Sequence, residues 1–562
     1  MDHHTAASPR RLSGRHAFLQ LLASEGVDTL FGNPGTTELA IMEALGDQSH
    51  IRYVLGLQES VVLSMADGYA RASGRLAVCN VHVAPGLGNA LGALYNAKFY
   101  GSPVLVTAGQ QEQGHGLAEP MLYDPLVPMA QPLVKWAVEC TRVEDLPRII
   151  RRAAKVALAP PTGPVFLSLP GDVLDAEADL EMGAPTRVET GVRPSDELLG
   201  RLAACLLEAP RPVLVAGHEL ATRDALDEAG RLAAMLGIPV LQQTVPYAAH
   251  FHSEHPAFVG ALTRNQRQVR EVLEPFDTLV FLGADVLRMS VFSTVDAMPP
   301  GRRVIQVSER DWELGKNYPA HLAIRADVKA TLQALLARLE ATMDAEARVA
   351  AAVRLATIAR DNWSTRRQSA VARADALSDR APLEPAFLAR VLSDAMPANA
   401  VVLEEALTTG FPLLSYLRLR DARGFYGLAS GGIGFAMGGA VGVSLAQPGR
   451  PVVALVGDGS AMYSVQALWT AAHLRLPITY VIANNRSYRI LKERLKSFRG
   501  TERFVGMDLH DPAIDFVALS ESLGVPAQRV DRPEAFEPAL RAAVASGGPR
   551  LLEVATADGF GA

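Results

Sequence analysis

The chain has 562 residues, 49% of them hydrophobic, and a formal net charge of −6 at pH 7. This length predicts about three or four domains with sizeable cores, and the mild charge gives no basic footprint for nucleic acid and no polybasic membrane patch. No run reaches the roughly 18 apolar residues of a membrane span. Met1 to Gly14 lacks the apolar stretch of a secretory signal, and the 3 cysteines form no CxxC pair. We therefore expect a cytoplasmic protein without structural zinc.

The first region, residues 12–180, alternates short apolar segments with longer segments of helical period. Such alternation predicts parallel strands joined by helices that cover both faces of a sheet. Residues 170–196 are polar and acidic without a clear period, and we interpret them as a linker. The expected strands are 29–32, 51–56, 76–82, 103–109 and 165–169, and the expected helices are 15–25, 60–72, 88–99 and 146–159.

The same alternation returns twice. The second region, residues 197–340, predicts strands at 212–217, 239–242, 278–283, 303–307 and 322–325, and helices at 221–236 and 328–339. Residues 341–379 are rich in Ala, Arg and Asp and predict a solvated helical connection. The third region, residues 383–556, alternates again. The expected fold is therefore α/β, with three doubly wound, flavodoxin-like parallel-sheet domains.

A glycine-flanked carboxylate follows the strand expected at 452–456 in the third region. Gly457 and Gly459 flank Asp458, and Ser460 could cap a following helix. A strand, a glycine turn and a helix start suit phosphate, but the carboxylate would repel phosphate unless a cation lay between them. The next expected strand, 478–483, ends in Asn484-Asn485.

Carboxylate and amide oxygens at neighbouring strand ends are ligands that suit Mg²⁺. Asp458 and Asn485 are therefore candidate metal ligands, and the backbone carbonyl of Ser487 is a candidate for a third. Alternatively, Asp458 and Asn485 bind no metal and are simply the polar residues at which the two strands end. The pair predicts a diphosphate bridged to the protein by a metal ion.

The stretch from Gly457 to Asn485 resembles the thiamine diphosphate signature of the 2-keto acid decarboxylase and carboligase superfamily. The resemblance covers nearly the whole chain, and its runs are most similar to those of benzoylformate decarboxylases. These runs are Phe31–Gly35, Val106–Gln111, Pro132–Trp136, Gly457–Ser460 and Ala467–Ala472.

The resemblance implies a pyrimidine-binding domain (12–180), a central domain (197–340) and a diphosphate-binding domain (383–556). It implies a lyase dependent on thiamine diphosphate and Mg²⁺ that decarboxylates a benzoylformate-like 2-keto acid through a carbanion-enamine, with carboligation to an aldehyde as a further outcome. The cofactor of such enzymes lies between the first domain of one chain and the third domain of another. A homodimer is therefore the minimum active unit, and a homotetramer is usual among relatives.

The resemblance also implies roles for single residues. Glu59 would bond the aminopyrimidine ring, His82 would move protons, and Thr36 would contact the substrate carboxylate. Glu59 and His82 each have a plainer interpretation, as a helix-start glutamate and as a structural histidine, whereas the added methyl of Thr36 would narrow the pocket. Ile433 would support the bent cofactor, or else belong to the core. The implied cofactor-binding residues are Glu59, Thr408, Thr409, Gly432, Ile433, Gly457, Asp458, Gly459, Ser460, Asn485 and Tyr488.

Three substrate-pocket positions depart from the family pattern. Ser290 stands where a second catalytic histidine is expected, which would slow protonation and favour carboligation. Ile490 replaces a small residue and would narrow the space for an aryl ring. Arg494 replaces an aromatic residue and could pair with an acidic group on the substrate, or be an ordinary exposed arginine. Gln113 and His115 are polar candidates for the cofactor face or for the surface.

Two rival functions remain open from the sequence, besides a nucleotide-binding α/β protein, for which the sequence offers no P-loop or dinucleotide fingerprint. One is an acetolactate-synthase-like carboligase acting on pyruvate. The other is a thiamine-diphosphate-binding protein with little turnover, which Ser290 motivates. The central region has no GxGxxG motif, and nothing in it calls for FAD.

Overall fold

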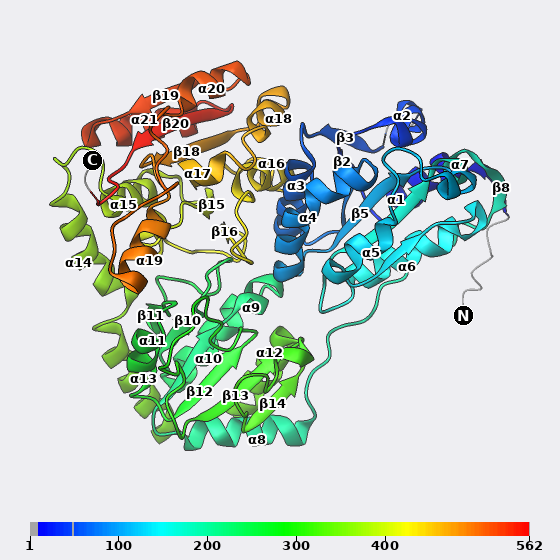
Figure 1. Cartoon of the computed structure of the whole chain (residues 1–562). Coiled ribbons are helices and arrows are strands. Elements are labelled where there is room, and N and C mark those ends of the chain that lie inside the picture. Colours follow the sequence, from blue (N-terminus) through cyan, green and yellow to red (C-terminus); the bar gives the residue numbers. More distant parts are fainter. Residues whose placement is uncertain (1–8, 48–49, 561–562) are drawn as a thin grey trace. The chain divides into compact units, whose positions relative to one another are not determined.

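The computed structural model describes residues 9–47 and 50–560 (Figure 1). It contains three six-stranded sheets, in which parallel pairs such as β12–β13, β17–β18 and β4–β5 form the ladders. This arrangement confirms the expected α/β class, whereas the domain limits stay predictions. The N-terminal sheet has the order β3-β2-β4-β5-β7-β6, with strands β2 (Thr29–Gly32), β3 (Arg52–Leu55), β4 (Ala77–Val81), β5 (Val104–Gln110), β6 (Ala137–Glu139) and β7 (Val165–Pro170).

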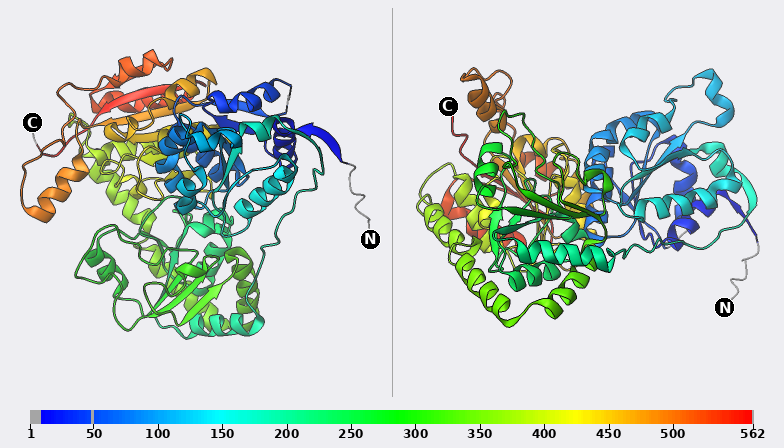
Figure 2. Two further views of the ribbon diagram at one scale, coloured as in Figure 1. Left: turned by 45° about the vertical axis from the view of Figure 1, so that its right-hand side comes forward. Right: turned by 90° about the horizontal axis from the view of Figure 1, so that it is seen from below.

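The central sheet has the order β11-β10-β9-β12-β13-β14 and appears in green in Figure 2. Its apolar strands bury Val213, Val215, Leu279 and Phe281 in one core cluster. Near-continuous apolar runs are typical of strands covered on both faces. The strands are β9 (Pro212–Ala216), β10 (Val240–Gln242), β11 (Phe258–Ala261), β12 (Thr278–Leu282), β13 (Arg303–Ser308) and β14 (Leu322–Arg325).

The third sheet has the order β16-β15-β17-β18-β20-β19. In the middle of this sheet β17 pairs with β18, so that Val452 lies opposite Ile478 and Gly457 opposite Ala483. The two strands thus end side by side. The strands are β15 (Val401–Glu405), β16 (Phe425–Gly427), β17 (Val452–Gly457), β18 (Ile478–Asn484), β19 (Ala527–Val530) and β20 (Arg550–Ala555).

Several expected boundaries were wrong. Residues 170–180 are no linker: they form helix α7 (Gly171–Asp175) and strand β8 (Glu177–Leu180), and β8 pairs antiparallel with β1 (Arg10–Ser13). The helix expected at 221–236 is two helices, α9 (His218–Thr222) and α10 (Leu226–Leu236), because the backbone turns left-handed at Asp224, with φ 51°.

Two further corrections concern helix starts near the candidate site. Helix α4 (Val83–Tyr100) begins directly after His82, earlier than the expected 88. Helix α17 (Asp458–Ala461) begins at Asp458 itself, so Ser460 lies inside the helix and does not cap it. Helix α17 thus starts at the residue that follows its strand, and α4 starts one residue later, after His82, so both polar side chains lie near the sheet edge.

The described residues divide into two compact units. One comprises the described residues up to Val188 with Leu428–Arg529 and Ala542–Glu553, and the other comprises Glu189–Gly427, Val530–Arg541 and the described residues from Val554 onward. The first unit contains the N-terminal sheet and strands β17 and β18, and the second contains the central sheet.

Helices α3 (Glu59–Ser73) and α16 (Ala436–Ala446) lie side by side in the first unit (Figures 1 and 2). Glycines permit the close approach: a Cβ on Gly68 would overlap the carbonyl of Gly439, and a Cβ on Gly442 would overlap the carbonyl of Met65. Small residues let two helix backbones touch, so dispersion contacts between backbones join the two helices.

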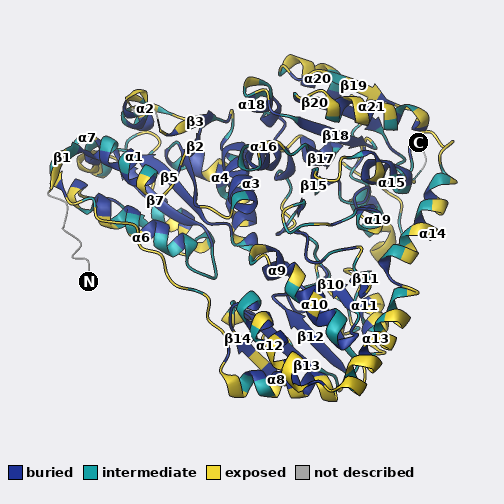
Figure 3. Cartoon of the chain, turned by 180° about the vertical axis from the view of Figure 1, so that it is seen from behind, coloured by how far each residue is buried: buried dark blue, intermediate teal, exposed yellow. Residues whose placement is uncertain are grey.

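The strands are mostly buried (dark blue in Figure 3), whereas the outer helices carry many exposed residues (yellow). Helix α13 (Ala345–Ala359) buries only Ala351 among its residues, and α14 (Trp363–Asp375) buries only Trp363, Ala370 and Ala374. The solvated helical character expected for residues 341–379 is thus confirmed. Among the described residues, no helix is long and apolar enough to cross a membrane.

Candidate functional site

Polar residues gather at the carboxyl ends of β2 and β4 in the N-terminal sheet. The strand order reverses between these two strands, and ligands of open α/β sheets bind in the crevice at such a switch point. Thr36 follows β2 in the short helix η1 (Thr36–Glu38), and His82 follows β4 as the residue that precedes α4. The next residue, Val83, has φ 39°. This conformation is unusual for a β-branched residue and marks backbone strain beside His82.

A buried carboxylate orients His82. The Nδ1 atom of His82 lies 2.8 Å from Oε2 of Glu38, whose side chain is fully buried. The same carboxylate accepts the N–H of Gly35 at 2.9 Å and the N–H of Gly109 at 2.8 Å. Because an ionised carboxylate only accepts hydrogen bonds, Nδ1 carries the proton of this bond, and Nε2 remains for proton exchange.

Two glycines make room for this pair. A Cβ on Gly35 would overlap the imidazole of His82, and a Cβ on Gly109 would overlap Oε1 of Glu38. We did not predict Glu38 from the sequence. Its only signal there is an acidic residue two positions after Thr36, and acidic residues near helix starts are usually exposed.

Glu59 is the first residue of α3 and is 8% exposed. Its carboxylate accepts hydrogen bonds from Asn33 Nδ2 at 3.3 Å and from Asn89 Nδ2 at 3.1 Å. A Cβ on Gly86 would come within 3.2 Å of Glu59 Oε1. Two amide donors and the close backbone of Gly86 thus hold the carboxylate in one position, and among the described residues no Lys or Arg forms an ion pair with it.

A hollow of about 940 Å³ lies beside this edge. Thr36 lines it together with Gln110, Gln111 and His115. The structure therefore places His115 in the same hollow as Thr36. Gln113 instead donates to Asp172 Oδ2 and to the carbonyl of Thr141, both at 3.1 Å, so its side chain is occupied by surface hydrogen bonds.

The second polar group of the first unit is at the ends of β17 and β18. Asp458 Oδ1 accepts the N–H of Gly459 at 2.8 Å, whereas Oδ2 is buried and has no hydrogen-bond partner within the described part of the chain. Burial raises the pKa of Asp458 to about 6. An orphaned buried carboxylate oxygen is costly, and a bound cation would satisfy it.

Asn485 and Ser487 follow β18, whose residue Ala483 pairs with Gly457, the residue before Asp458. Asn485 Oδ1 accepts the N–H of Ser487 at 3.0 Å, and Ser487 is buried. Asn484 is turned away, with Nδ2 donating to Glu553 Oε1 at 2.8 Å. The ring of Tyr488 packs against the turn, because a Cβ on Gly459 would come within 2.5 Å of it. The oxygens of Asp458, Asn485 and Ser487 are the donor set that Mg²⁺ prefers.

Helix α19 (Arg489–Arg499) continues from this turn. Ile490, Arg494 and Phe498 recur every four residues and therefore share one face. The Arg494 guanidinium lies 5.7 Å from the ring centroid of Phe498, and among the described residues it has no carboxylate at ion-pair distance. By contrast, Arg489 pairs with Glu493 at 2.9 Å, and Lys492 pairs with Asp508 at 2.6 Å.

The remaining predicted residues are spread over both units. Gly432 is exposed and Ile433 is half-buried in the loop before α16, which belongs to the first unit. Thr408 and Thr409 follow β15 in the second unit and are buried. Ser290 is exposed in the loop after β12, also in the second unit. Within the part of the chain that the structure describes, no hydrogen bond or ion pair joins Glu59 or His82 to Asp458.

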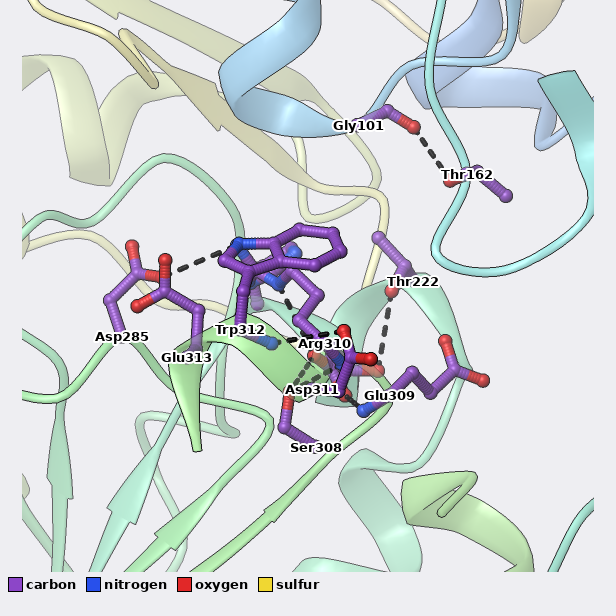
Figure 4. Close-up of polar contacts among 12 residues, drawn as sticks. Gly101, Thr162, Thr222, Asp285, Ser308, Glu309, Arg310, Asp311, Trp312 and Glu313 are labelled. Carbon is purple, nitrogen blue, oxygen red and sulfur yellow. Dashed lines mark hydrogen bonds and ion pairs between the residues drawn. The ribbon is translucent and has the colours of Figure 1, made fainter. Parts of the chain in front are cut away.

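The switch point of the central sheet, between β9 and β12, is occupied by ion pairs (Figure 4). Arg310 lies 3.3 Å from Asp285 and 3.4 Å from Glu219, and Nη2 lies 2.8 Å from Nε2 of His218. Ser308 donates to Glu219 at 2.6 Å. Burial, then the positive charge of Arg310, keeps the pKa of His218 well below its usual range. The polar groups of this edge thus pair with one another.

Comparison with protein families gives matches in all three regions. Residues 12–121 match the thiamine pyrophosphate enzyme N-terminal TPP binding domain. Residues 199–335 match the central domain of the same enzymes, and residues 411–554 match their C-terminal TPP binding domain.

Relatives of known name align over nearly the whole chain. The chain is 33% identical over 547 residues to a benzoylformate decarboxylase of Pseudomonas aeruginosa, covering 96% of this chain and 98% of that protein. It is 30% identical over 550 residues to a putative acetolactate synthase large subunit of Mycobacterium tuberculosis, covering 97% and 99%. A thiamine diphosphate-dependent 4-hydroxybenzoylformate decarboxylase of Rhodococcus jostii has a similar structure, with a TM-score of 0.86, 33% identity, and coverage of 97% and 99%.

Proposed function

Because this chain belongs to the thiamine pyrophosphate enzymes, we propose that it is a Mg²⁺-dependent decarboxylase of a 2-keto acid of the benzoylformate type. The observation that carries the proposal is the orphaned, buried Oδ2 of Asp458 beside Asn485, which fits a cation that bridges to a diphosphate. Thiamine diphosphate, when bound, supplies the electron sink that decarboxylation needs.

In this proposal each side chain has one task. Asp458, Asn485 and the Ser487 carbonyl hold Mg²⁺, and Glu59 holds a proton at the pyrimidine ring. Asn33 and Asn89 keep the Glu59 carboxylate in place through their amide donors. Tyr488, Gly432, Thr408 and Thr409 contact the cofactor, with Gly457, Gly459 and Ser460 in the turn.

His82 and Thr36 act on the substrate. Thr36 binds the substrate carboxylate from the hollow shared with Gln111 and His115. His82 exchanges protons through Nε2, because Glu38 holds Nδ1. General acid–base groups placed in this way typically contribute about 10²–10⁴-fold in rate. Ser290, in place of a second histidine, slows the final protonation and leaves time for an aldehyde to be captured.

We further propose that the cofactor site requires more than one chain. In the enzymes that the sequence resembles, the cofactor lies between the first domain of one chain and the third domain of another, so we assign Glu59 and Asp458 to different active sites of a homodimer, which can pair further into a homotetramer. Large apolar side chains that are exposed in the single chain, including Leu117 (98%), Met121 (86%) and Val505 (87%), suit burial by further copies.

The test is a panel of 2-keto acids supplied with Mg²⁺ and thiamine diphosphate. Benzoylformate should yield CO₂ and an aldehyde, and an Glu59→Gln variant should lose at least about 100-fold in rate. Glu43→Gln, at an exposed carboxylate of the hollow that Thr36 lines, is the matched control. Formation of acetolactate from pyruvate, with benzoylformate untouched, would favour the carboligase alternative. Cofactor binding without consumption of any 2-keto acid would leave only a binding protein.

A further inference from the structure

The loop Ser430–Gly434, just before α16, is open to solvent but has a constrained backbone. Gly431 and Gly432 are exposed, and Gly431 and Gly434 have φ of 82° and 111°, a region that favours glycine. Glycine-rich loops lose much conformational entropy when they are ordered. Something must therefore hold this loop if it is to receive a ligand in one conformation.

One buried amide holds the first end of the loop. Oδ1 of Asn96, on α4, accepts the backbone N–H of Ser430 at 3.2 Å and its hydroxyl at 3.1 Å. The hydroxyl oxygen of Ser430 in turn accepts the N–H of Gly432 at 3.0 Å. Asn96 is only 2% exposed, so its amide cannot exchange these bonds for water.

An ion pair fixes the orientation of that amide. Nδ2 of Asn96 donates to Asp67 Oδ2 at 3.2 Å, and Asp67 also accepts the Ser102 hydroxyl. Arg71 binds Asp67 through two donors, at 2.8 and 2.6 Å, and both side chains are at most 1% exposed. A flipped amide would point its oxygen at a carboxylate and its NH₂ at an N–H group, so only one orientation satisfies both neighbours.

The same ion pair holds the other end of the loop. Phe435 follows Gly434 directly, and its ring centroid lies 4.0 Å from the Arg71 guanidinium. The ring centroid of Tyr100 lies 4.1 Å from the same guanidinium. Ser64, on α3, donates its hydroxyl to the carbonyl of Gly434 at 3.3 Å. Both ends of this exposed loop, which contains three glycines, are thus tied to a single buried cluster on α3 and α4.

We propose that Asn96 is a positioning residue: with Asp67 and Arg71 behind it, it presets the Ser430–Gly434 loop, and so Ile433, before thiamine diphosphate arrives. The inference rests on the proposed function, because Ile433 is the residue assigned to support the cofactor. A preset loop lowers the ordering cost of binding. The pyrimidine-side helices of this chain thereby set the affinity of its diphosphate-side loop.

The test compares Ser430→Ala with Thr470→Val in the full chain. Thr470 donates its hydroxyl to the carbonyl of Leu55 at 2.8 Å, so the control also removes one hydroxyl bond within the same unit, but away from the loop. Thiamine diphosphate affinity is measured by titration with Mg²⁺ present, and backbone hydrogen exchange of residues 430–435 is measured without cofactor. We expect Ser430→Ala to weaken cofactor binding about tenfold and to speed exchange in the loop, because buried hydrogen bonds are lost. Thr470→Val should change neither the cofactor affinity nor the exchange rate. Ser430→Thr, which keeps the hydroxyl, should leave both at their wild-type values.

The outcomes separate this inference from the proposed function. If wild type binds no thiamine diphosphate, the proposed function fails. If wild type binds it and Ser430→Ala binds equally well, the positioning role is wrong. Unchanged exchange of the loop in both Ser430→Ala and Asn96→Ala would overturn the inference by itself, with or without cofactor binding.

Discussion

The contact between Glu38 and His82 leads to the sharpest prediction about activity. Each oxygen of Glu38 is fully used: Oε2 by His82 Nδ1 and the Gly35 N–H, and Oε1 by the Gly109 N–H and the Thr37 hydroxyl. Glu38→Gln keeps the shape but turns one oxygen into a donor. Whichever way the amide points, a donor then faces a backbone N–H inside a site that is closed to water.

The expected magnitude follows from these contacts. One unsatisfied buried donor costs about 1–3 kcal/mol, so the variant should fold with a modest loss of stability. His82 loses its negatively charged acceptor and its fixed tautomer. Since a positioned acid–base group is worth about 10²–10⁴-fold, we expect kcat for benzoylformate to fall by about 10²-fold or more. Affinity for thiamine diphosphate should stay within about twofold, because Glu59 and Asp458 are untouched.

The assay couples aldehyde formation to NADH consumption, alongside cofactor titration and thermal unfolding. Glu43→Gln is the control, because it makes the same chemical change at an exposed carboxylate that lines the neighbouring hollow beside Thr36 and Thr37. An unchanged kcat in a folded Glu38→Gln protein would refute the orienting role. A fall in kcat matched by an equal loss of cofactor affinity would show that Glu38 acts by supporting the fold.

Four further predictions test other parts of the structure. Burial lowers the pKa of His250 to about 3, so the stability it contributes is present above about pH 6.5 and declines as pH falls. Between pH 7.5 and pH 5.5, the free energy of unfolding measured by urea titration should fall by about 1 kcal/mol less in His250→Phe than in wild type. An equal fall in both proteins would contradict this. Arg494→Gln should lower kcat/KM for 2-keto acids with a second acidic group about tenfold, while Arg499→Gln should not; loss with uncharged substrates instead would show a different role. Gly68→Ala should lower the melting temperature by several degrees, because a Cβ there overlaps the Gly439 carbonyl; an unchanged melting curve would mean that the helices can separate. Asp458→Asn should abolish activation by Mg²⁺, measured as thiamine diphosphate affinity with and without the ion; a retained Mg²⁺ effect would remove Asp458 from the ligand set.

Strand-and-turn features were predictable from the sequence because they depend on local chemistry. The apolar run before Asp458 predicted β17, and the position of His82 after a short apolar strand predicted its place at the sheet edge. The helix starts were less predictable, because Val83 and Asp458 continue directly into helices that tertiary packing, rather than a capping residue, determines. The extent of the linker was wrong because β8 pairs with β1, 160 or more positions away, and such pairing leaves no local signal.

The candidate site was predictable only in part for the same reason. Asp458 and Asn485 stand in recognisable turns, but the position of Glu38 depends on Gly35, in the turn after β2, and on Gly109, in β5. Its burial, and not its neighbours in sequence, distinguishes it from an ordinary helix-start glutamate. Asn96 is similar, because its partners Asp67 and Ser430 come together only in the folded chain.

The backbone contact between α3 and α16 has a consequence for how this protein can evolve. Because Gly68 and Gly442 admit no side chain, small substitutions cannot adjust the spacing of the two helices. We expect substitutions at these two positions to destabilise the fold instead of changing the spacing gradually. Residues such as Ile490 and Arg494 lie on a helix that does not share this restriction. New substrate preferences can therefore be explored on α19 while the frame that carries the cofactor groups keeps its geometry.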